Sequence, residues 1–187
     1  MCVFFRIVTV FVLLSFSVPA DACTTFWLSY QGQSYVGKNY DWDLVDGLVL
    51  INKKGMNKKA LNFNAGNRAV EWRSKYASLT FNQYGREMPN GGMNSAGLVV
   101  EVMWFNKTLY PKVDERPSIN ELQWIQYQLD NYSTTAEVVT NAHKIRVAPI
   151  YAKVHYLVCD SGSSCAALEY VNHKLVESRF YTRSYEH

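Results

Sequence analysis

The chain has 187 residues, a formal net charge of +3 at neutral pH, and 48% hydrophobic and 14% aromatic residues. This length allows one domain with a substantial hydrophobic core. The basic residues are not interleaved with aromatic side chains as they are in a nucleic-acid groove, so we expect no nucleic-acid partner. The aromatic residues indicate either a large core or an apolar substrate cleft.

Residues 1–22 have the layout of a secretory signal peptide. A single arginine precedes the apolar stretch 7–16, which is shorter than the roughly 20 residues that a membrane span needs. Ala20 and Ala22 are small residues of the kind that signal peptidase accepts before its cleavage site. We therefore expect cleavage after Ala22 rather than a retained membrane anchor. Export to the periplasm or the extracellular space would leave residues 23–187 as the mature domain, without a further segment apolar enough to cross a membrane.

Cleavage would make Cys23 the first residue of the mature chain. A cysteine with a free α-amino group carries a nucleophile and a candidate base together. An α-amine has a pKa of about 7.7–8.0 and can accept the thiol proton near neutral pH. The alternative is lipid modification of Cys23, which would make the protein a surface-anchored lipoprotein with a binding role. Ala20 stands where such lipoproteins usually have Leu, so the sequence fits this alternative poorly.

Segments with high β-propensity fill the first half of the mature chain. Residues 24–30 and 34–36 flank a candidate turn and predict a β-hairpin. Residues 48–51 predict a buried strand, and residues 76–81 predict another strand. The strongest strand signal covers residues 97–105. A pair of adjacent glycines before this last segment predicts a break in the chain.

Two helices are predicted after these strands. Residues 118–121 have the Ser-x-x-Glu pattern of a capping box and precede apolar residues at helical spacing. Residues 134–137 form a second box, Thr-x-x-Glu, which opens a helix toward Ile145. Strands resume at residues 154–159, 165–170 and 174–177. This order of strands, two helices and strands predicts an α+β domain rather than alternating βαβ units.

Cys159 and Cys165 flank a loop rich in turn residues between two apolar segments, which predicts a hairpin. Cysteines that face each other across a short hairpin can reach disulfide geometry, and the bond persists in the oxidising surroundings of an exported protein. We therefore predict a Cys159–Cys165 disulfide, with two buried free thiols as the alternative. The four histidines are scattered and no CxxC pattern occurs, so we expect no metal site.

The segment 37–43 should return beside Cys23 after the hairpin turn. Lys38 would then place a positive charge near the thiol and favour the thiolate. Asp41 would hold the α-ammonium group and fix its direction. Each of these two residues, taken alone, could equally be a solvated turn residue. Their spacing from Cys23 is what indicates a catalytic role.

Five segments of the chain form a combined pattern. They are Cys23-Thr-Thr-Phe, Gly37-Lys-Asn-Tyr-Asp-Trp-Asp, Phe81-Asn-Gln-Tyr-Gly-Arg, Gly92-Met-Asn-Ser-Ala-Gly-Leu and the helix 120–129. Together they resemble the choloylglycine hydrolase family of linear amide C–N hydrolases, which includes bile salt hydrolases and penicillin V acylases. The resemblance implies the N-terminal-nucleophile hydrolase fold, a four-layer αββα sandwich. It also implies that the terminal cysteine hydrolyses small-molecule amides, here with an apolar acyl group, without a cofactor.

Position by position, the resemblance implies that Cys23 is the nucleophile and that Asp41 contacts its amine. Lys38 stands where bile salt hydrolases have Arg, which keeps the charge but loses the planar fork of donors. Trp104 stands where bile salt hydrolases have an oxyanion-hole Asn and penicillin V acylases a Tyr. Its indole N–H could donate one hydrogen bond, but we expect a packing role. Arg183 occupies the position where the family has a second Asn that helps to stabilise the oxyanion.

Members of this family continue beyond the position of His187, and a later active-site Arg has no counterpart in this sequence. We therefore expect a chain shortened at its C-terminus. Such a chain could be an active amidase, an inactive remnant of one, or a homo-oligomer that closes its site by dimerisation. Bile salts, penicillin V and N-acyl homoserine lactones are all compatible substrates.

Overall fold

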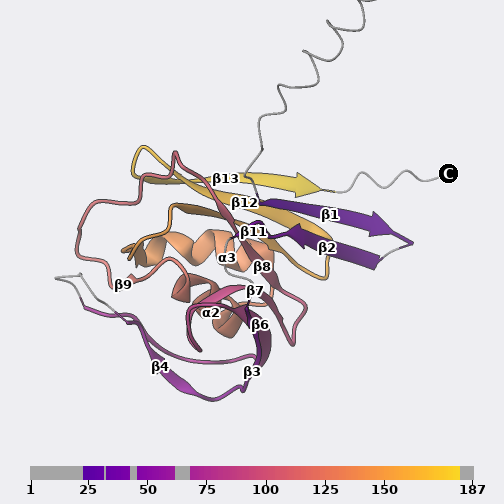
Figure 1. Ribbon diagram of the computed structural model, residues 1–187, viewed down its shortest axis with the longest axis horizontal. Helices are drawn as coiled ribbons and strands as arrows, with labels where there is room; N and C mark the ends of the chain where they lie inside the picture. The colour runs from indigo at the N-terminus through magenta and orange to yellow at the C-terminus, as the bar shows by residue number, and fades with distance from the viewer. Residues whose placement is uncertain (1–22, 32, 43–45, 62–67, 182–187) are drawn as a thin grey trace, which may run out of the picture.

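The fold is built on a seven-stranded antiparallel sheet, seen in a computed structural model (Figure 1). The structure describes residues 23–31, 33–42, 46–61 and 68–181, so the predicted signal peptide and Arg183 lie outside it. The strand order is β13-β12-β11-β8-β7-β6-β3. These strands are β3 (Leu48–Asn52), β6 (Ser78–Asn82), β7 (Pro89–Asn94), β8 (Val99–Trp104), β11 (Val154–Cys159), β12 (Ser164–Val171) and β13 (Lys174–Tyr181).

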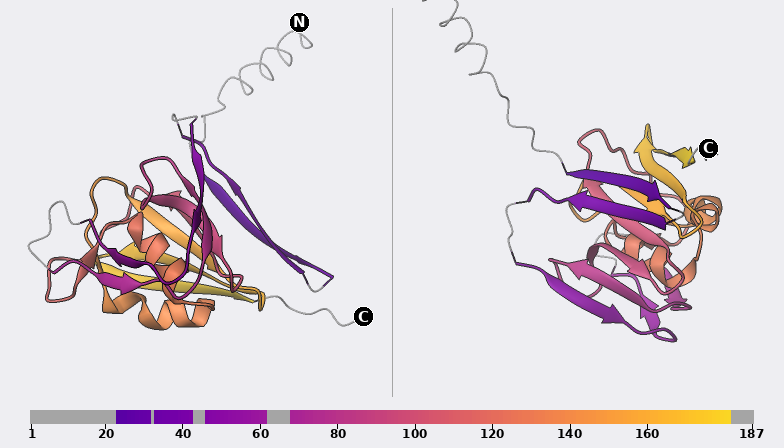
Figure 2. Two further views of the ribbon diagram at one scale, coloured as in Figure 1. Left: turned by 90° about the horizontal axis from the view of Figure 1, so that it is seen from below. Right: turned by 90° about the vertical axis from the view of Figure 1, so that its right-hand side faces the viewer.

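Two helices cover one face of this sheet (Figures 1 and 2). They are α2 (Gln123–Asn131) and α3 (Thr135–Asn141), and the 3-10 turn η1 (Ala142–Lys144) follows α3. The main hydrophobic core lies between helices and sheet. Its fully buried members include Trp124, Ile125, Leu129, Val138, Leu98, Val100, Tyr156, Val158 and Leu168. Burial of these side chains, more than helix propensity, stabilises two helices this short.

The two predicted capping boxes have different outcomes. Thr134 and Glu137 form the predicted reciprocal box at the start of α3, which ends at Asn141 and continues as η1 rather than as one helix. The prediction of a capping box at residues 118–121 is wrong. The Asn120 side chain accepts hydrogen bonds from the backbone N–H groups of residues 122 and 123, at 3.1 and 2.8 Å. The Glu121 carboxylate instead binds a distant loop.

Two short sheets flank the main one. β4 (Asn57–Lys59) pairs antiparallel with β5 (Glu71–Arg73), and β9 (Ser118–Ile119) pairs parallel with β10 (Arg146–Val147). The second pairing places the residues before α2 beside the residues that lead into β11. The loop between β10 and β11 therefore passes close to Glu121.

A β-hairpin lies across the other face of the main sheet (Figure 2). β1 (Thr24–Tyr30) and β2 (Gln33–Asn39) pair antiparallel, as the sequence predicts. Their side chains Trp27 and Val36 pack against a cluster formed by Met103, Leu157, Cys159 and Cys165. The described residues thus form a helical layer, the main sheet and two strands of a second β layer, in the order of the predicted αββα sandwich.

The hairpin covers only part of this face. Beyond it, cross-strand register aligns exposed apolar side chains of β3, β6 and β7. We call this surface the apolar platform; it consists of Val49, Ile51, Leu79, Phe81 and Met93. The prediction that residues 48–51 form a buried strand is therefore wrong in its burial, because β3 is an edge strand whose Ile51 is 67% exposed.

Cys159 and Cys165 form the predicted disulfide. They are register partners in β11 and β12, with Cα atoms 4.1 Å apart, and both are buried under the hairpin. No helix in the described part of the chain is long and apolar enough to cross a membrane.

Candidate active site

Cys23 lies at the entrance to β1, at the end of the hairpin far from its turn. Its side chain is half-buried, and it is the one free cysteine among the described residues. The thiol Sγ lies 3.8 Å from the backbone carbonyl oxygen of Asp41. The hairpin therefore returns the segment after β2 to the Cys23 thiol, as the sequence predicts.

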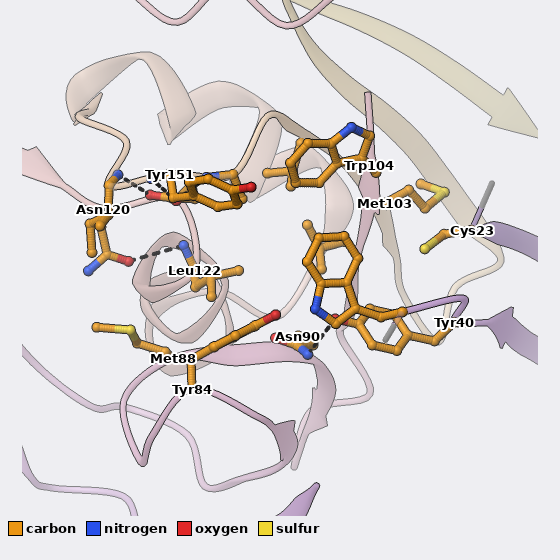
Figure 3. A pocket seen from close by; sticks show the side chains of 16 residues that line it. Cys23, Tyr40, Tyr84, Met88, Asn90, Met103, Trp104, Asn120, Leu122 and Tyr151 are labelled. Atoms are coloured by element: carbon orange, nitrogen blue, oxygen red, sulfur yellow. Dashed lines mark hydrogen bonds between the residues drawn. The ribbon is translucent and has the colours of Figure 1, made fainter. Parts of the chain in front are cut away.

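A cavity of about 570 Å³ opens beside Cys23 (Figure 3). Aromatic and aliphatic side chains form most of its wall. Trp42 and Trp104 stack with ring centroids 5.5 Å apart, and Tyr151 lies 6.2 Å from Trp104. The remaining wall includes Tyr40, Tyr84, Met88, Val102, Met103 and Leu122. A cavity with this lining suits an apolar, and in particular a flat, group next to a thiol.

Lys38 belongs to β2, and its side chain lies within electrostatic reach of Cys23. Its ammonium group donates a hydrogen bond to the backbone carbonyl oxygen of Asn90 at 2.8 Å and forms an ion pair with Glu101 at 3.2 Å. It also lies 4.6 Å from the centroid of the Tyr40 ring. Burial lowers the pKa of Lys38, and Glu101 and Cys23 oppose this shift. Lys38 is thus where the sequence places it, but Glu101 compensates its charge.

Glu101 is a site residue that the sequence analysis missed. Burial raises the pKa of this carboxyl group, and Lys38 opposes the shift. Glu101 is the register partner of Gly91, and a Cβ atom at position 91 would overlap its carboxylate. The prediction that the glycine pair breaks the chain is therefore wrong, because both glycines lie within β7. A glycine in a strand often marks such a close approach, which is the signal that could have revealed the pair.

Asp41 presents its backbone, rather than its carboxylate, to the thiol. The carboxylate accepts a hydrogen bond from the Asn39 side chain at 2.8 Å. In the full chain the Cys23 nitrogen belongs to a peptide bond. Contact between Asp41 and a free α-amine therefore stays a prediction about the processed protein.

Trp104 contributes a wall of the cavity. Its indole N–H donates a hydrogen bond to the Asn106 side chain at 2.6 Å, and its ring stacks on Trp42. Both contacts fit the packing role that we expected rather than the oxyanion role.

A polar network on the cavity floor was also missed. The Asn90 amide group donates hydrogen bonds to the Tyr40 hydroxyl and to the Gln83 side chain, at 2.9 and 2.8 Å. Burial raises the pKa of Tyr40 above its ordinary value. The Asn90 side-chain oxygen is buried without a hydrogen-bond partner among the described residues, and Asn90 lines the cavity. A substrate N–H or a water molecule is the natural partner for such an atom.

Metal binding finds no support in the described ranges, which contain no group of three or more His, Cys, Asp or Glu residues arranged to hold an ion.

Comparison with known proteins identifies the family of this chain. The sequence model of the family "linear amide C–N hydrolases, choloylglycine hydrolase family" matches residues 23–179. Penicillin V acylase from Pectobacterium atrosepticum is 27% identical over 180 residues, which are 86% of this chain and 47% of that protein.

Two solved structures have the same fold. Penicillin V acylase from Agrobacterium tumefaciens has a TM-score of 0.71 at 28% identity, with coverage of 84% of this chain and 49% of that one. A variant of conjugated bile acid hydrolase from Clostridium perfringens has a TM-score of 0.70 at 19% identity, with coverage of 83% and 50%. The chain thus spans about half the length of these relatives. With its family match over nearly all of the described residues, the chain belongs to the choloylglycine hydrolase family of linear amide C–N hydrolases.

Proposed function

We propose that this protein hydrolyses linear amides with Cys23 as an N-terminal nucleophile. The observation that carries the proposal is the position of the Cys23 thiol beside an aromatic cavity of about 570 Å³. Membership of an amidase family supports the reaction class. The proposal includes removal of residues 1–22 as a signal peptide on export to the periplasm or the extracellular space, which frees the Cys23 amine.

The reaction would proceed by acyl transfer. The α-amine of Cys23 takes the thiol proton, and the thiolate attacks the amide carbonyl carbon. The tetrahedral intermediate collapses to a thioester as the C–N bond breaks, and the leaving amine takes the proton back from the α-ammonium group. Water then attacks the thioester with the α-amine again as base. This step releases a carboxylic acid and restores the thiol.

The other site residues have supporting roles in this proposal. Asp41 orients the freed α-amine, and Lys38 stabilises the thiolate through its positive charge. The Asn90 side-chain oxygen is available to accept a hydrogen bond from the substrate amide N–H.

The lining of the cavity favours an apolar acyl group. Penicillin V and conjugated bile acids, which the names of the relatives give as their substrates, are therefore the first two probes. An N-acyl homoserine lactone is a third.

The first experiment measures the N-terminus and the turnover of the exported protein. We expect intact mass to show a chain that begins at Cys23 with an unmodified amine. A diacylglyceryl adduct on Cys23 would instead support the lipoprotein alternative. We expect turnover of at least one of the three probes.

The Cys23→Ala variant tests the mechanism directly. It should lose at least about 10³-fold in kcat, because the acyl-enzyme cannot form. Ser29→Ala is a control at an exposed position on β1, the strand that follows Cys23, and it should keep the wild-type rate. Retained turnover in Cys23→Ala would end the proposal, and so would a processed wild-type chain that turns over none of the probes.

A further inference from the structure

The Glu121 carboxylate binds three consecutive backbone N–H groups of the loop between β10 and β11. Its oxygens accept hydrogen bonds from Ile150 at 2.8 Å, from Tyr151 at 3.0 Å and from Ala152 at 2.8 Å. Glu121 is only 3% exposed. Hydrogen bonds from N–H groups to an ionised carboxylate are roughly twice as strong as neutral ones, so this contact fixes the conformation of the loop.

Other hydrogen bonds fix the two ends of the same loop. At one end, the Ala148 N–H donates to the Ile119 carbonyl oxygen at 2.8 Å. At the other end, the Phe105 N–H donates to the Lys153 carbonyl oxygen at 2.8 Å. Between these points Glu121 provides the contacts to the backbone N–H groups of residues 150–152. The Tyr110 hydroxyl also donates a hydrogen bond to the Ala152 carbonyl oxygen at 2.8 Å. The N–H groups in the middle of the loop depend on Glu121.

The residues that Glu121 holds form a wall of the cavity beside Cys23. Ile150, Tyr151 and Ala152 all line it, and the Tyr151 ring faces Trp104 (Figure 3). Tyr151 is 77% exposed and Ile150 is 42% exposed, so little side-chain packing holds them. Their positions must come mainly from the backbone, and hence from Glu121.

We propose that Glu121 is a positioning residue that sets the acyl-group specificity of the site by holding Tyr151 at the rim of the cavity. It does not act on the reacting atoms, because loop N–H groups occupy both of its oxygens. The favoured substrates are amides whose acyl group carries an aromatic ring, which can pack against the rim that Tyr151 forms with the stacked Trp42 and Trp104 rings. This inference rests on the proposed hydrolase activity.

The test compares two amides that share one amine and differ in acyl group, phenoxyacetyl and acetyl. Glu121→Gln keeps the shape of the side chain, but its NH₂ group cannot accept a hydrogen bond, so at least one loop N–H loses its partner. We expect kcat/KM for the phenoxyacetyl amide to fall about tenfold or more, mainly through KM. The acetyl amide, which has no ring to pack against Tyr151, should change less than about twofold.

A double-mutant cycle identifies the residue through which Glu121 acts. Tyr151→Ala should reproduce the loss for the phenoxyacetyl amide, and adding Glu121→Gln should cost little more. Glu115→Gln, which removes an exposed carboxylate outside the cavity, is the matched control and should behave as wild type. Equal losses for both amides, or additive losses in the double variant, would overturn the inference.

Measuring ligand binding to a chain without Cys23 tests the role of Glu121 independently of the proposed reaction. Phenoxyacetate should bind to the Cys23→Ala chain about tenfold more tightly than to the Cys23→Ala/Glu121→Gln chain in calorimetry. If the wild-type protein turns over neither amide, the hydrolase proposal fails, and this difference in affinity still decides the role of Glu121. Equal affinities would show that Glu121 does not shape the cavity.

Discussion

Glu101 and Lys38 form an ion pair that joins the hairpin to the central strand of the main sheet. Lys38 belongs to β2 and Glu101 to β8, and about an eighth of each side chain is exposed. Burying two charges costs several kcal/mol per ion unless the contacts are good. Here the Asn90 carbonyl oxygen and the Tyr40 ring add to the contacts of Lys38. The pair fixes the end of the hairpin where Cys23 lies.

The raised pKa of Glu101 predicts a pH-dependent stability. Between its ordinary value of 4.5 and its raised value, the native state binds more protons at Glu101 than the unfolded state does. The contribution of this group is therefore fully present below about pH 4.5 and is lost as pH rises through the folded pKa. Urea unfolding from pH 4 to 7 should show that the wild-type free energy of unfolding falls relative to that of Glu101→Gln. A difference that stays constant over this range would contradict the prediction.

At the scale of elements, contacts spread along the length of the β1–β2 hairpin hold it on the main sheet. The Ser34 hydroxyl lies 2.7 Å from that of Ser163 near the turn, and Trp27 and Val36 pack in the middle. The Lys38–Glu101 pair holds the other end. The packing in the middle includes the Cys159–Cys165 disulfide.

Removal of this disulfide should destabilise the protein without unfolding it. In Cys159→Ala/Cys165→Ala, the loss of a cross-link with a sequence separation of 6 should lower the free energy of unfolding by about 2 kcal/mol. Alanine avoids burying new polar groups at two positions that are almost fully buried. Urea denaturation of wild type and variant under oxidising conditions measures the difference. Equal unfolding midpoints and slopes would show that the bond contributes nothing.

Elements with local signals could be predicted from the sequence. The hairpin, the Thr134 capping box and the disulfide each depend on residues that are close together along the chain. Glu121 was misassigned because its partners are about 30 residues away, and a capping pattern carries no information about a competing loop. Similarly, the apolar residues at 48–51 correctly indicated a strand, but the sequence does not show whether another element covers that face of the sheet.

The site was only partly predictable for the same reason. The predicted signal peptide drew attention to Cys23, and the return of the segment with Lys38 follows from the hairpin. A single glutamate in an apolar strand gives no motif of its own, so the only sequence signal for Glu101 was the glycine at position 91. Asn90 stands next to the glycine pair that predicted a break in the chain, and only the pairing of β7 with β8 shows why position 91 needs glycine.

At the scale of the whole molecule, the apolar platform is an exposed surface that the proposed function does not use. Phe81 and Met93 are each about half exposed, and they adjoin the face that the hairpin covers. Contiguous apolar patches of this kind mark surfaces that associate. We propose that the chain self-associates through the platform; a homo-oligomer was one of the three alternatives that the sequence left open.

Phe81→Lys should weaken this self-association, because burying a charged side chain on β6, the middle strand of the platform, costs free energy. Sedimentation velocity over a range of protein concentrations should show a lower mean sedimentation coefficient for Phe81→Lys than for the wild type. Val113→Lys, at a position that is 73% exposed in a loop, is the control and should sediment as the wild type does. A wild-type protein that stays monomeric at all concentrations would contradict the prediction.

The contacts of the hairpin also constrain the order in which the molecule can assemble. Thr25 bonds to a residue 78 positions later, and Ser34 to one 129 positions later. β1 and β2 can pair with each other early, because hairpins close in microseconds. Docking onto the sheet must wait for β8, β11 and β12, since contacts of long sequence separation form slowly. During synthesis, therefore, the Cys23 thiol is present long before the cavity beside it has formed, so the order of assembly keeps thiol and cavity apart until the sheet is complete.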